Sequence, residues 1–246
     1  ALKTLILNYT SEAGVRDLQR KLHDIYRKII LQSMKEEQNL RFSLEPKDLK
    51  KYLDTQDLKE QDKPLLHECG LVNMLAVTPF GGTVMQVEVI SYNGKGEIYT
   101  TGSLGDTLKE SLKVVTSYVK ANSSNFNINE NSFNKKCLHF HFLSGAIPKN
   151  GPSAGVSITT SLISLLKNKK VSKDIAFTGE MTLRGEILPV GGIKEKLIGA
   201  YNYGIKKVFI PFKNKNDLKE IPKEVKNNLE IIFVSNYLEI YEAIFN

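Results

Sequence analysis

Ser153 stands in the stretch Gly151-Pro152-Ser153-Ala154-Gly155, where a glycine-flanked serine could act as a nucleophile. A serine hydroxyl attacks a carbonyl only when a nearby base takes its proton. The G-x-S-x-G elbow of α/β-hydrolases needs a histidine later in the chain and a sharp strand–turn–helix. Here Leu143–Asn150 separates the preceding predicted strand from the motif, and every histidine precedes Ser153 (His23, His67, His139 and His141). The elbow class is therefore excluded.

His139 and His141 are the remaining histidine candidates for the base. Some serine proteases place the histidine before the serine, so either could serve in principle. The two lie in a predicted strand over 138–142, and a spacing of two puts them on one face of it. Hydrogen bonding near a sheet edge explains the pair without catalysis, and this is the interpretation we favour. A two-histidine metal site is a further alternative, but no third ligand is evident, so we predict no metal site.

A lysine is the other possible base, and the stretch Gly191-Gly192-Ile193-Lys194-Glu195-Lys196 offers two. A lysine acts as a base only when neutral, which burial promotes because it disfavours the ammonium form. Both lysines lie at the start of a predicted helix over 193–203. Lys196 has small residues at positions i−4, i+3 and i+4, which would let other backbone approach closely (Gly192, Gly199 and Ala200). Spacing thus mildly favours Lys196, and Lys194 stays open.

A structural role for Ser153 must be set beside the catalytic one, because serine commonly caps helix N-termini. A predicted core helix over 154–167, apolar around much of its circumference, follows it directly. Backbone amides at such a helix start form an anion site, and in an enzyme they would form an oxyanion hole. The alternative function is therefore a non-catalytic oligomerisation or anion-binding module with Ser153 as a helix cap.

The elements around these motifs predict an α+β fold, because strands and helices alternate after residue 63. The pattern predicts a hairpin of 83–91 and 97–101 around the turn 92–96, a polar loop over 121–135, and a helix over 193–203 stopped by Gly204. We expect further helices over 104–120, 215–228 and 237–245. Further strands or extended segments are expected over 175–178, 182–183, 187–188, 207–210 and 230–234.

The first part of the chain predicts a small helical region. Apolar residues recur at three- and four-residue steps over 11–36, with Thr10 or Ser11 as N-cap, and Pro46 opens a shorter helix through Leu53. The polar stretch 54–63 marks a boundary. We therefore predict two domains, 1–55 and 56–246.

Composition limits the possible partners. The net charge is +7, but the lysines are scattered, so nucleic acid is not indicated. Cys69 and Cys137 have no metal-ligand spacing, and no apolar run reaches membrane-spanning length. No cleavable leader is evident, and the opening residues look like a cut inside a longer protein.

Three motifs carry a family resemblance, and they cover the two sites of interest. The runs 148–155 (PKNGPSAG), 178–185 (TGEMTLRG) and 187–196 (ILPVGGIKEK) resemble the proteolytic domain of Lon, the ATP-dependent serine protease. The resemblance implies Ser153 as nucleophile, Lys196 as its general base and the Thr178 hydroxyl as a support for the lysine. It also implies that the amides of Ser153 and Ala154 form the oxyanion hole.

The first helical piece resembles the C-terminal helical subdomain of an AAA+ module, and the run 12–16 (EAGVR) implies Arg16 as a nucleotide sensor. No G-x-x-x-x-G-K-[ST] sequence occurs, so we expect this chain to bind no cofactor itself. ATP and Mg²⁺ would belong to the full-length protein. The resemblance further implies unfolded or damaged protein substrates and a homohexamer. It places the protein in the mitochondrial matrix, with the bacterial cytoplasm as alternative. Asn150 stands where many relatives have aspartate.

Overall fold

The computed structural model describes residues 1–10, 12–36, 43–54, 67–129, 131–143 and 149–246. The chain forms two compact units, Ala1–Leu65 and Leu66–Asn246. The predicted boundary between residues 55 and 56 lies outside the described residues.

The first unit is helical and has a small core of its own. Its elements are α1 (Leu2–Tyr9), α2 (Arg16–Glu36), the 3-10 turn η1 (Pro46–Asp48) and α3 (Leu49–Tyr52). The prediction that the long helix starts at residue 11 with a Thr10 or Ser11 cap is wrong. The Glu12 carboxylate instead accepts hydrogen bonds from the Asp17 and Leu18 amides, so the helix begins at Arg16. The core gathers apolar side chains from the described helices (Leu5, Tyr9, Ile25, Leu49, Tyr52 and Leu53).

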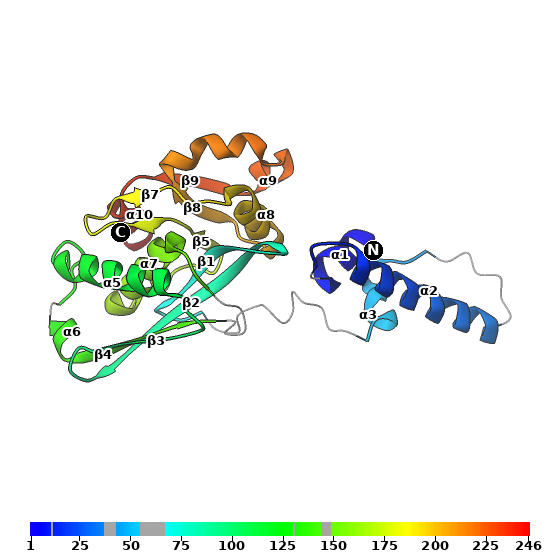
Figure 1. Cartoon of the computed structure of the whole chain (residues 1–246), viewed down its shortest axis with the longest axis horizontal. Coiled ribbons are helices and arrows are strands. Elements are labelled where there is room, and N and C mark those ends of the chain that lie inside the picture. The colour runs from blue at the N-terminus through cyan, green and yellow to red at the C-terminus, as the bar shows by residue number, and fades with distance from the viewer. Residues whose placement is uncertain (11, 37–42, 55–66, 130, 144–148) are drawn as a thin grey trace. The chain divides into compact units, whose positions relative to one another are not determined.

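The second unit is built on a mixed seven-stranded sheet, which confirms the predicted α+β class (Figure 1). The strand order is β3-β4-β2-β1-β5-β8-β9, and β6 pairs with β7 in a separate two-stranded sheet. The β1–β2 and β2–β4 pairs are antiparallel, and the other pairs of the large sheet are parallel. The strands are β1 (Leu71–Thr78), β2 (Gly81–Asn93), β3 (Ile98–Thr101), β4 (Lys136–Phe142), β5 (Ile175–Phe177), β6 (Glu180–Met181), β7 (Ile187–Leu188), β8 (Lys207–Pro211) and β9 (Glu230–Val234).

The predicted hairpin of β2 with β3 is wrong, because β4 lies between them. β4 pairs antiparallel with β2 and parallel with β3. Its side chains at Leu138, Phe140 and Phe142 are fully buried, whereas β3 is mostly exposed. The more apolar strand takes the inner position and β3 becomes the edge, an arrangement that a local turn signal does not reveal.

Helices cover both faces of this sheet in three layers (Figure 1). Side chains of α5, α7 and α10 share one core with the sheet, and those of α8 and α9 share a second core on the other face. The predicted core helix and the helix over 193–203 are confirmed, including the Gly204 stop at φ 94°. The helical elements are α5 (Asp106–Ala121), α6 (Asn131–Asn134), η2 (Pro152–Ala154), α7 (Gly155–Lys167), α8 (Ile193–Tyr203), η3 (Phe212–Glu220), α9 (Lys223–Asn228) and α10 (Tyr237–Phe245).

Three further predictions need correction. The extended segment expected over 182–183 belongs to a turn, and β6 lies just before it. The polar segment 121–135 is not a surface loop throughout, because Phe126, Ile128 and Phe133 reach into the core. The helix expected over 215–228 is divided into η3 and α9. Pro222 separates them, because proline has no amide to continue a helix and is tolerated at a helix start.

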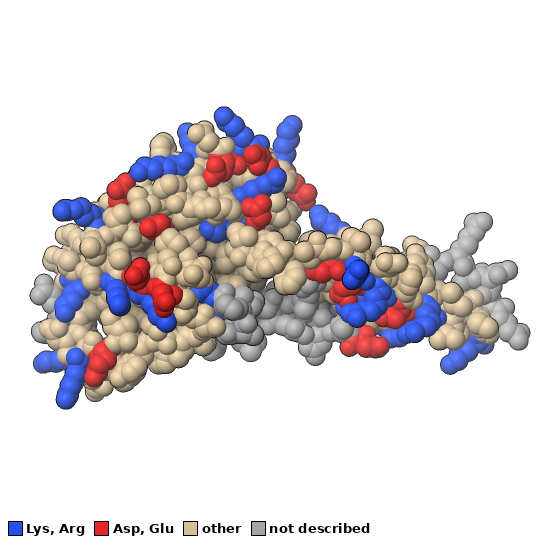
Figure 2. Space-filling view, in the orientation of Figure 1, with Lys and Arg blue, Asp and Glu red and all other residues tan. Residues whose placement is uncertain are grey.

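The surface carries charges of both signs. Figure 2 shows lysine and arginine side chains interspersed with aspartate and glutamate over the visible face. This agrees with the scattered lysines of the sequence. None of the described helices is long and apolar enough to cross a membrane.

Candidate active site

Ser153 lies in η2, the tight turn that leads into α7. Gly151 enters this turn with φ 129°, a backbone conformation that residues with a side chain rarely adopt. The segment after β5 holds the turn from the other side. The Ser153 carbonyl oxygen accepts a 2.9 Å hydrogen bond from the Gly179 amide, and the Val156 amide donates to the Gly179 carbonyl. The serine backbone is therefore fixed to the main sheet.

The Ser153 side chain does not cap α7. Ala154 occupies the cap position and has no capping side chain. The Ser153 hydroxyl forms no hydrogen bond with any residue that the structure describes, and it borders two cavities. The helix-cap interpretation therefore loses its structural basis, whereas a hydroxyl that faces a cavity is available to a ligand.

Lys196 is buried at the start of α8, with 3% of its surface exposed. Desolvation by burial lowers its pKa to about 8. Lys194 is nearly half exposed at its side chain and approaches Glu220 to 4.0 Å. Of the two lysines that spacing left open, Lys196 alone has the burial that a neutral amine requires.

A glycine contact explains how Lys196 comes to be buried. A Cβ on Gly199 would overlap the Gly82 carbonyl group and lie 2.7 Å from the Thr83 amide nitrogen. Glycine at both positions lets the backbone of α8 lie directly on β2. The close approach predicted from Gly199 is therefore confirmed. It places the face of α8 that carries Lys196 against the sheet.

Thr178 joins the two candidate residues. Its side chain is fully buried immediately after β5. The Lys196 Nζ donates a 3.0 Å hydrogen bond to the Thr178 Oγ1. The Thr178 hydroxyl in turn donates a 3.4 Å hydrogen bond to the Ser153 carbonyl oxygen. One hydroxyl thus contacts both the lysine head group and the serine backbone.

Ser153 and Lys196 line one open cavity of about 420 Å³. No hydrogen bond joins these two described side chains. Catalytic contacts are often long in unliganded sites, so the missing hydrogen bond is compatible with an acid–base role. The same cavity includes Glu180, a carboxylate that the sequence motifs did not single out as functional. Asn150 also lines it, near the serine turn.

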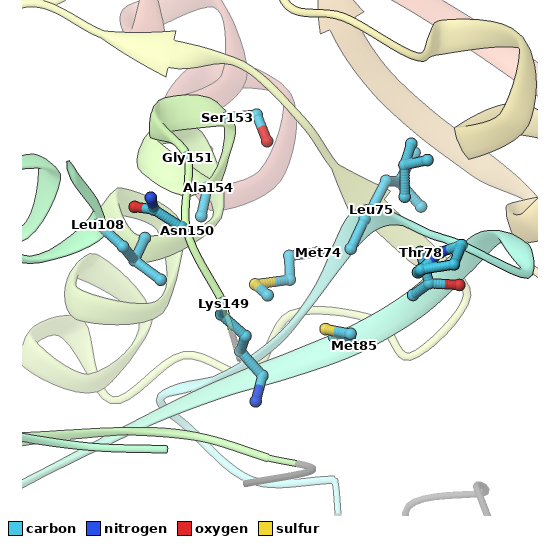
Figure 3. Close-up of a pocket in the computed structure, with 13 residues that line it drawn as sticks. Met74, Leu75, Thr78, Met85, Leu108, Lys149, Asn150, Gly151, Ser153 and Ala154 are labelled. Atoms are coloured by element: carbon cyan, nitrogen blue, oxygen red, sulfur yellow. The ribbon is translucent and has the colours of Figure 1, made fainter. Parts of the chain in front are cut away.

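A second cavity of about 160 Å³ opens beside Ser153 (Figure 3). Its wall combines the serine turn with side chains of β1, β2 and α5, which are far apart in the sequence. Sequence reasoning missed it, because nothing local marks which side chains of a buried strand border a hollow. Its apolar lining includes Met74, Ala76, Met85 and Leu108.

The two histidines of β4 lie on one face, as predicted, and share a single partner. The Thr101 Oγ1 is 3.1 Å from His139 Nε2 and 2.7 Å from His141 Nδ1. This is the sheet-edge hydrogen bonding that we favoured, since β3 is the edge strand. Among the described residues no group of three or more potential ligands could hold a metal ion. Cys69 and Cys137 are free thiols.

Arg16, the predicted nucleotide sensor, is exposed at the first position of α2. It lies in the first unit, whereas Ser153, Thr178 and Lys196 all lie in the second. The described contacts of Arg16 do not test its predicted role.

The comparisons with known proteins divide the chain into two parts. Residues 43–246 match the family model described as the Lon protease (S16) C-terminal proteolytic domain. Residues 1–42 match the model of the Lon protease AAA+ ATPase lid domain. The chain is 44% identical over 246 residues to a Lon protease of Mycoplasma mycoides, covering all of this chain and 31% of that protein.

Other similar proteins agree with this match. A Lon protease of Mycoplasma pneumoniae is 45% identical over 98% of the chain and 30% of that protein. A Lon protease of Fusobacterium nucleatum is 43% identical over 98% of the chain and 32% of that protein. The chain thus spans a little under a third of the length of the relatives it matches.

Proposed function

The chain belongs to the Lon protease family, and on that basis we propose that it performs the peptide hydrolysis of an ATP-dependent serine endopeptidase. The observation that supports this most directly is the cavity shared by Ser153 and Lys196. A half-buried hydroxyl and a lysine with a pKa of about 8 are the two components that a serine–lysine pair needs.

The proposed reaction runs in two stages. The neutral Lys196 Nζ accepts the proton of the Ser153 hydroxyl while the Oγ attacks the peptide carbonyl carbon. The resulting ammonium returns the proton to the leaving amine as the C–N bond breaks, which leaves an acyl ester on Ser153. Lys196 then takes a proton from water, the water oxygen attacks the ester, and the proton returns to the Ser153 Oγ.

The oxyanion that forms in each stage requires donors that are already in place. The amides of Ser153 and Ala154 lie in the first turn of a helical segment, where amide groups lack intrahelical acceptors. We assign these two amides to the oxyanion hole. Such donors stabilise developing charge more than water does, because they need no reorganisation.

The smaller cavity beside Ser153 would take the substrate side chain next to the scissile bond, although Thr78, Lys149 and Asn150 also line it. Its volume of about 160 Å³ and its methionine, leucine and alanine lining fit a medium-sized apolar side chain. Buried apolar residues become accessible when a protein unfolds, which agrees with unfolded or damaged proteins as substrates.

Other parts of the proposal rest on the family alone. ATP with Mg²⁺ would drive substrate delivery in the full-length protein, with Arg16 as a sensor of the nucleotide. The chain has no G-x-x-x-x-G-K-[ST] sequence, so binding of the nucleotide phosphates is assigned to none of its residues. A homohexamer would enclose the sites. The similar proteins named above are bacterial, so we propose the bacterial cytoplasm, and the expected mitochondrial matrix gains no support from them.

Degradation of an unfolded protein by the full-length protease tests this proposal. We expect Ser153→Ala and Lys196→Ala to abolish cleavage while ATP hydrolysis continues, and Lys194→Ala on the same helix to retain cleavage. If both site variants cleave at the parent rate, the pair is not catalytic. That result would favour the rival function, a module that binds anions or assembles subunits without cleaving peptides.

A further inference from the structure

We propose that Lys149 is a positioning residue for Ser153. Its buried ammonium binds the segment 102–105 and so holds the chain just before η2, the turn that carries Ser153. The inference rests on the proposed function, since positioning matters only if Ser153 reacts. Lys149 precedes Ser153 closely in the chain and is 6% exposed. Neither histidine–serine nor lysine–serine reasoning assigns it a role.

Three hydrogen bonds connect Lys149 to one short segment. Its Nζ donates to the Gly102 carbonyl oxygen at 3.1 Å. Its amide donates to the Ser103 carbonyl oxygen at 3.0 Å, and its carbonyl oxygen accepts from the Gly105 amide at 2.7 Å. The side chain and the backbone therefore bind the same short segment, at Gly102, Ser103 and Gly105, which fixes both the position and the direction of the chain at Lys149.

The segment 102–105 is itself fixed in position by its contacts with β4. Ser103 has φ 60°, a conformation that non-glycine residues adopt only when the surroundings impose it. A Cβ on Gly102 would overlap the Phe142 carbonyl oxygen, so the segment lies directly on the end of β4. The residue before it, Thr101, is bonded to His139 and His141 of the same strand.

The segment 102–105 also contacts Asn150, which lies between Lys149 and Ser153 in the chain. The Asn150 side chain packs against Gly105, where a Cβ would lie 2.7 Å from the Asn150 Cγ. A Cβ placed on Gly151 would meet no described atom within 4 Å beyond its chain neighbours, so this side of the turn faces open space. The serine turn is thus held by Gly179 and Thr178 on one side and by Lys149 with Asn150 on the other.

The charge of Lys149 points to a function beyond filling space. Burial lowers the pKa of Lys149, which means that its ammonium is desolvated at a cost to stability. Figure 3 shows its Nζ directed away from the Ser153 hydroxyl. Lys149 therefore acts through the backbone that it binds, while Lys196 remains the partner of the serine proton.

The reaction of Ser153 with a fluorophosphonate probe in the full-length protease tests the inference, together with kcat, KM and thermal unfolding. We expect Lys149→Met to slow acylation and kcat by about ten- to a hundredfold, because small misplacements of a reacting group cost that much. Because Lys149 also lines the cavity assigned to the substrate side chain, KM should change as well, and the distinguishing result is a pH midpoint of acylation equal to that of the parent. Lys149→Arg should restore part of the rate. Lys113→Met, on the exposed side of α5, serves as the matched control.

A second variant covers the case in which Lys149→Met lowers the unfolding temperature. Gly105→Ala disturbs the Asn150 contact while the lysine remains, and we expect the same loss of acylation rate. The inference is overturned if folded variants at both positions acylate as fast as the parent. It is also overturned if Lys149→Met moves the pH midpoint, because Lys149 would then act on the proton directly. A parent that does not acylate, or labelling that survives in Ser153→Ala, would instead refute the proposed function.

Discussion

The Lys196 ammonium donates its hydrogen bond to the Thr178 hydroxyl, 3.0 Å away. Thr178 in turn directs its hydroxyl toward the carbonyl oxygen of Ser153 rather than toward its side chain. The lysine is therefore held next to the serine by a third residue before any substrate enters. Three features can therefore be tested separately: the protonation of Lys196, the hydrogen bond of the Thr178 hydroxyl, and the packing of α8 on β2.

The pH dependence of acylation should follow Lys196. Because its pKa is about 8, the neutral base is scarce at low pH, and the rate should fall about tenfold for each pH unit below that value. Above it the rate should level off. Single-turnover acylation across the pH range measures this. In Lys196→Arg this pH-dependent fall in rate should disappear together with most of the activity. A fall with a midpoint near pH 8 in that variant would assign the titration to another group.

Thr178→Val should weaken catalysis without unfolding the protein. The substitution keeps the shape but removes the acceptor of the Lys196 hydrogen bond, so the lysine head group loses its fixed position. A hydrogen bond to a charged group is worth about 1.5–3 kcal/mol, so we expect kcat to fall by about ten- to a hundredfold. Thr178→Ser keeps the hydroxyl and should retain most of the activity. Equal kcat values for Thr178→Val and the parent would exclude a supporting role.

Lys196→Met should stabilise the proteolytic unit at neutral pH while it abolishes activity. A pKa lowered from 10.5 to about 8 corresponds to a burial cost of about 3 kcal/mol below pH 8. Loss of the Thr178 hydrogen bond offsets about 1.5–3 kcal/mol of this gain, so the net stabilisation is at most about 1.5 kcal/mol. Since the folded pKa lies below the unfolded one, the cost is fully present below pH 8 and vanishes as the pH approaches 10.5. Urea unfolding of both proteins at pH 7 and pH 10 should show the difference shrinking.

The sequence predicted the parts of the site that depend on local pattern. The serine turn, the core helix after it and helix α8 lie close to where periodicity and glycine placed them. The small residues around Lys196 correctly indicated a close backbone approach, and burial distinguishes it from Lys194. The choice between the two lysines still needed the family motif, because helical spacing carries no information about what covers a face.

The errors arose where distant segments decide the structure. β4 separates β2 from β3, although the turn between them has hairpin residues. Phe126 and Phe133 are buried inside a polar segment, since a few aromatic side chains suffice to hold it on the core. Lys149 is buried, and Glu180 borders the site, because segments distant in the sequence converge there. Such contacts depend on tertiary packing, which single-sequence patterns do not encode.

Ala76→Leu should change substrate preference at the smaller cavity beside Ser153. Ala76 is only partly buried and lines the cavity from β1, so a larger side chain fills the space at little cost to folding. A pocket that loses room for one or two methylene groups discriminates by about 1–3 kcal/mol. We expect kcat/KM to fall for peptides with leucine or phenylalanine before the cleaved bond, and much less for alanine. An unchanged ratio between these peptides would place the substrate side chain elsewhere.

Gly199→Ala should separate the position of Lys196 from its chemistry. The new methyl group would meet the backbone of Gly82 and Thr83, which cannot rotate away as a side chain could, so α8 must lift off β2. Overpacking of this kind costs about 1–3 kcal/mol, and the displaced lysine should lose its contact with Thr178. We expect a lower unfolding temperature and at least a tenfold lower acylation rate. Lys194→Ala, at an exposed position on the same helix, is the control. If Gly199→Ala were as active and stable as Lys194→Ala, direct backbone contact between α8 and β2 would not be what buries Lys196.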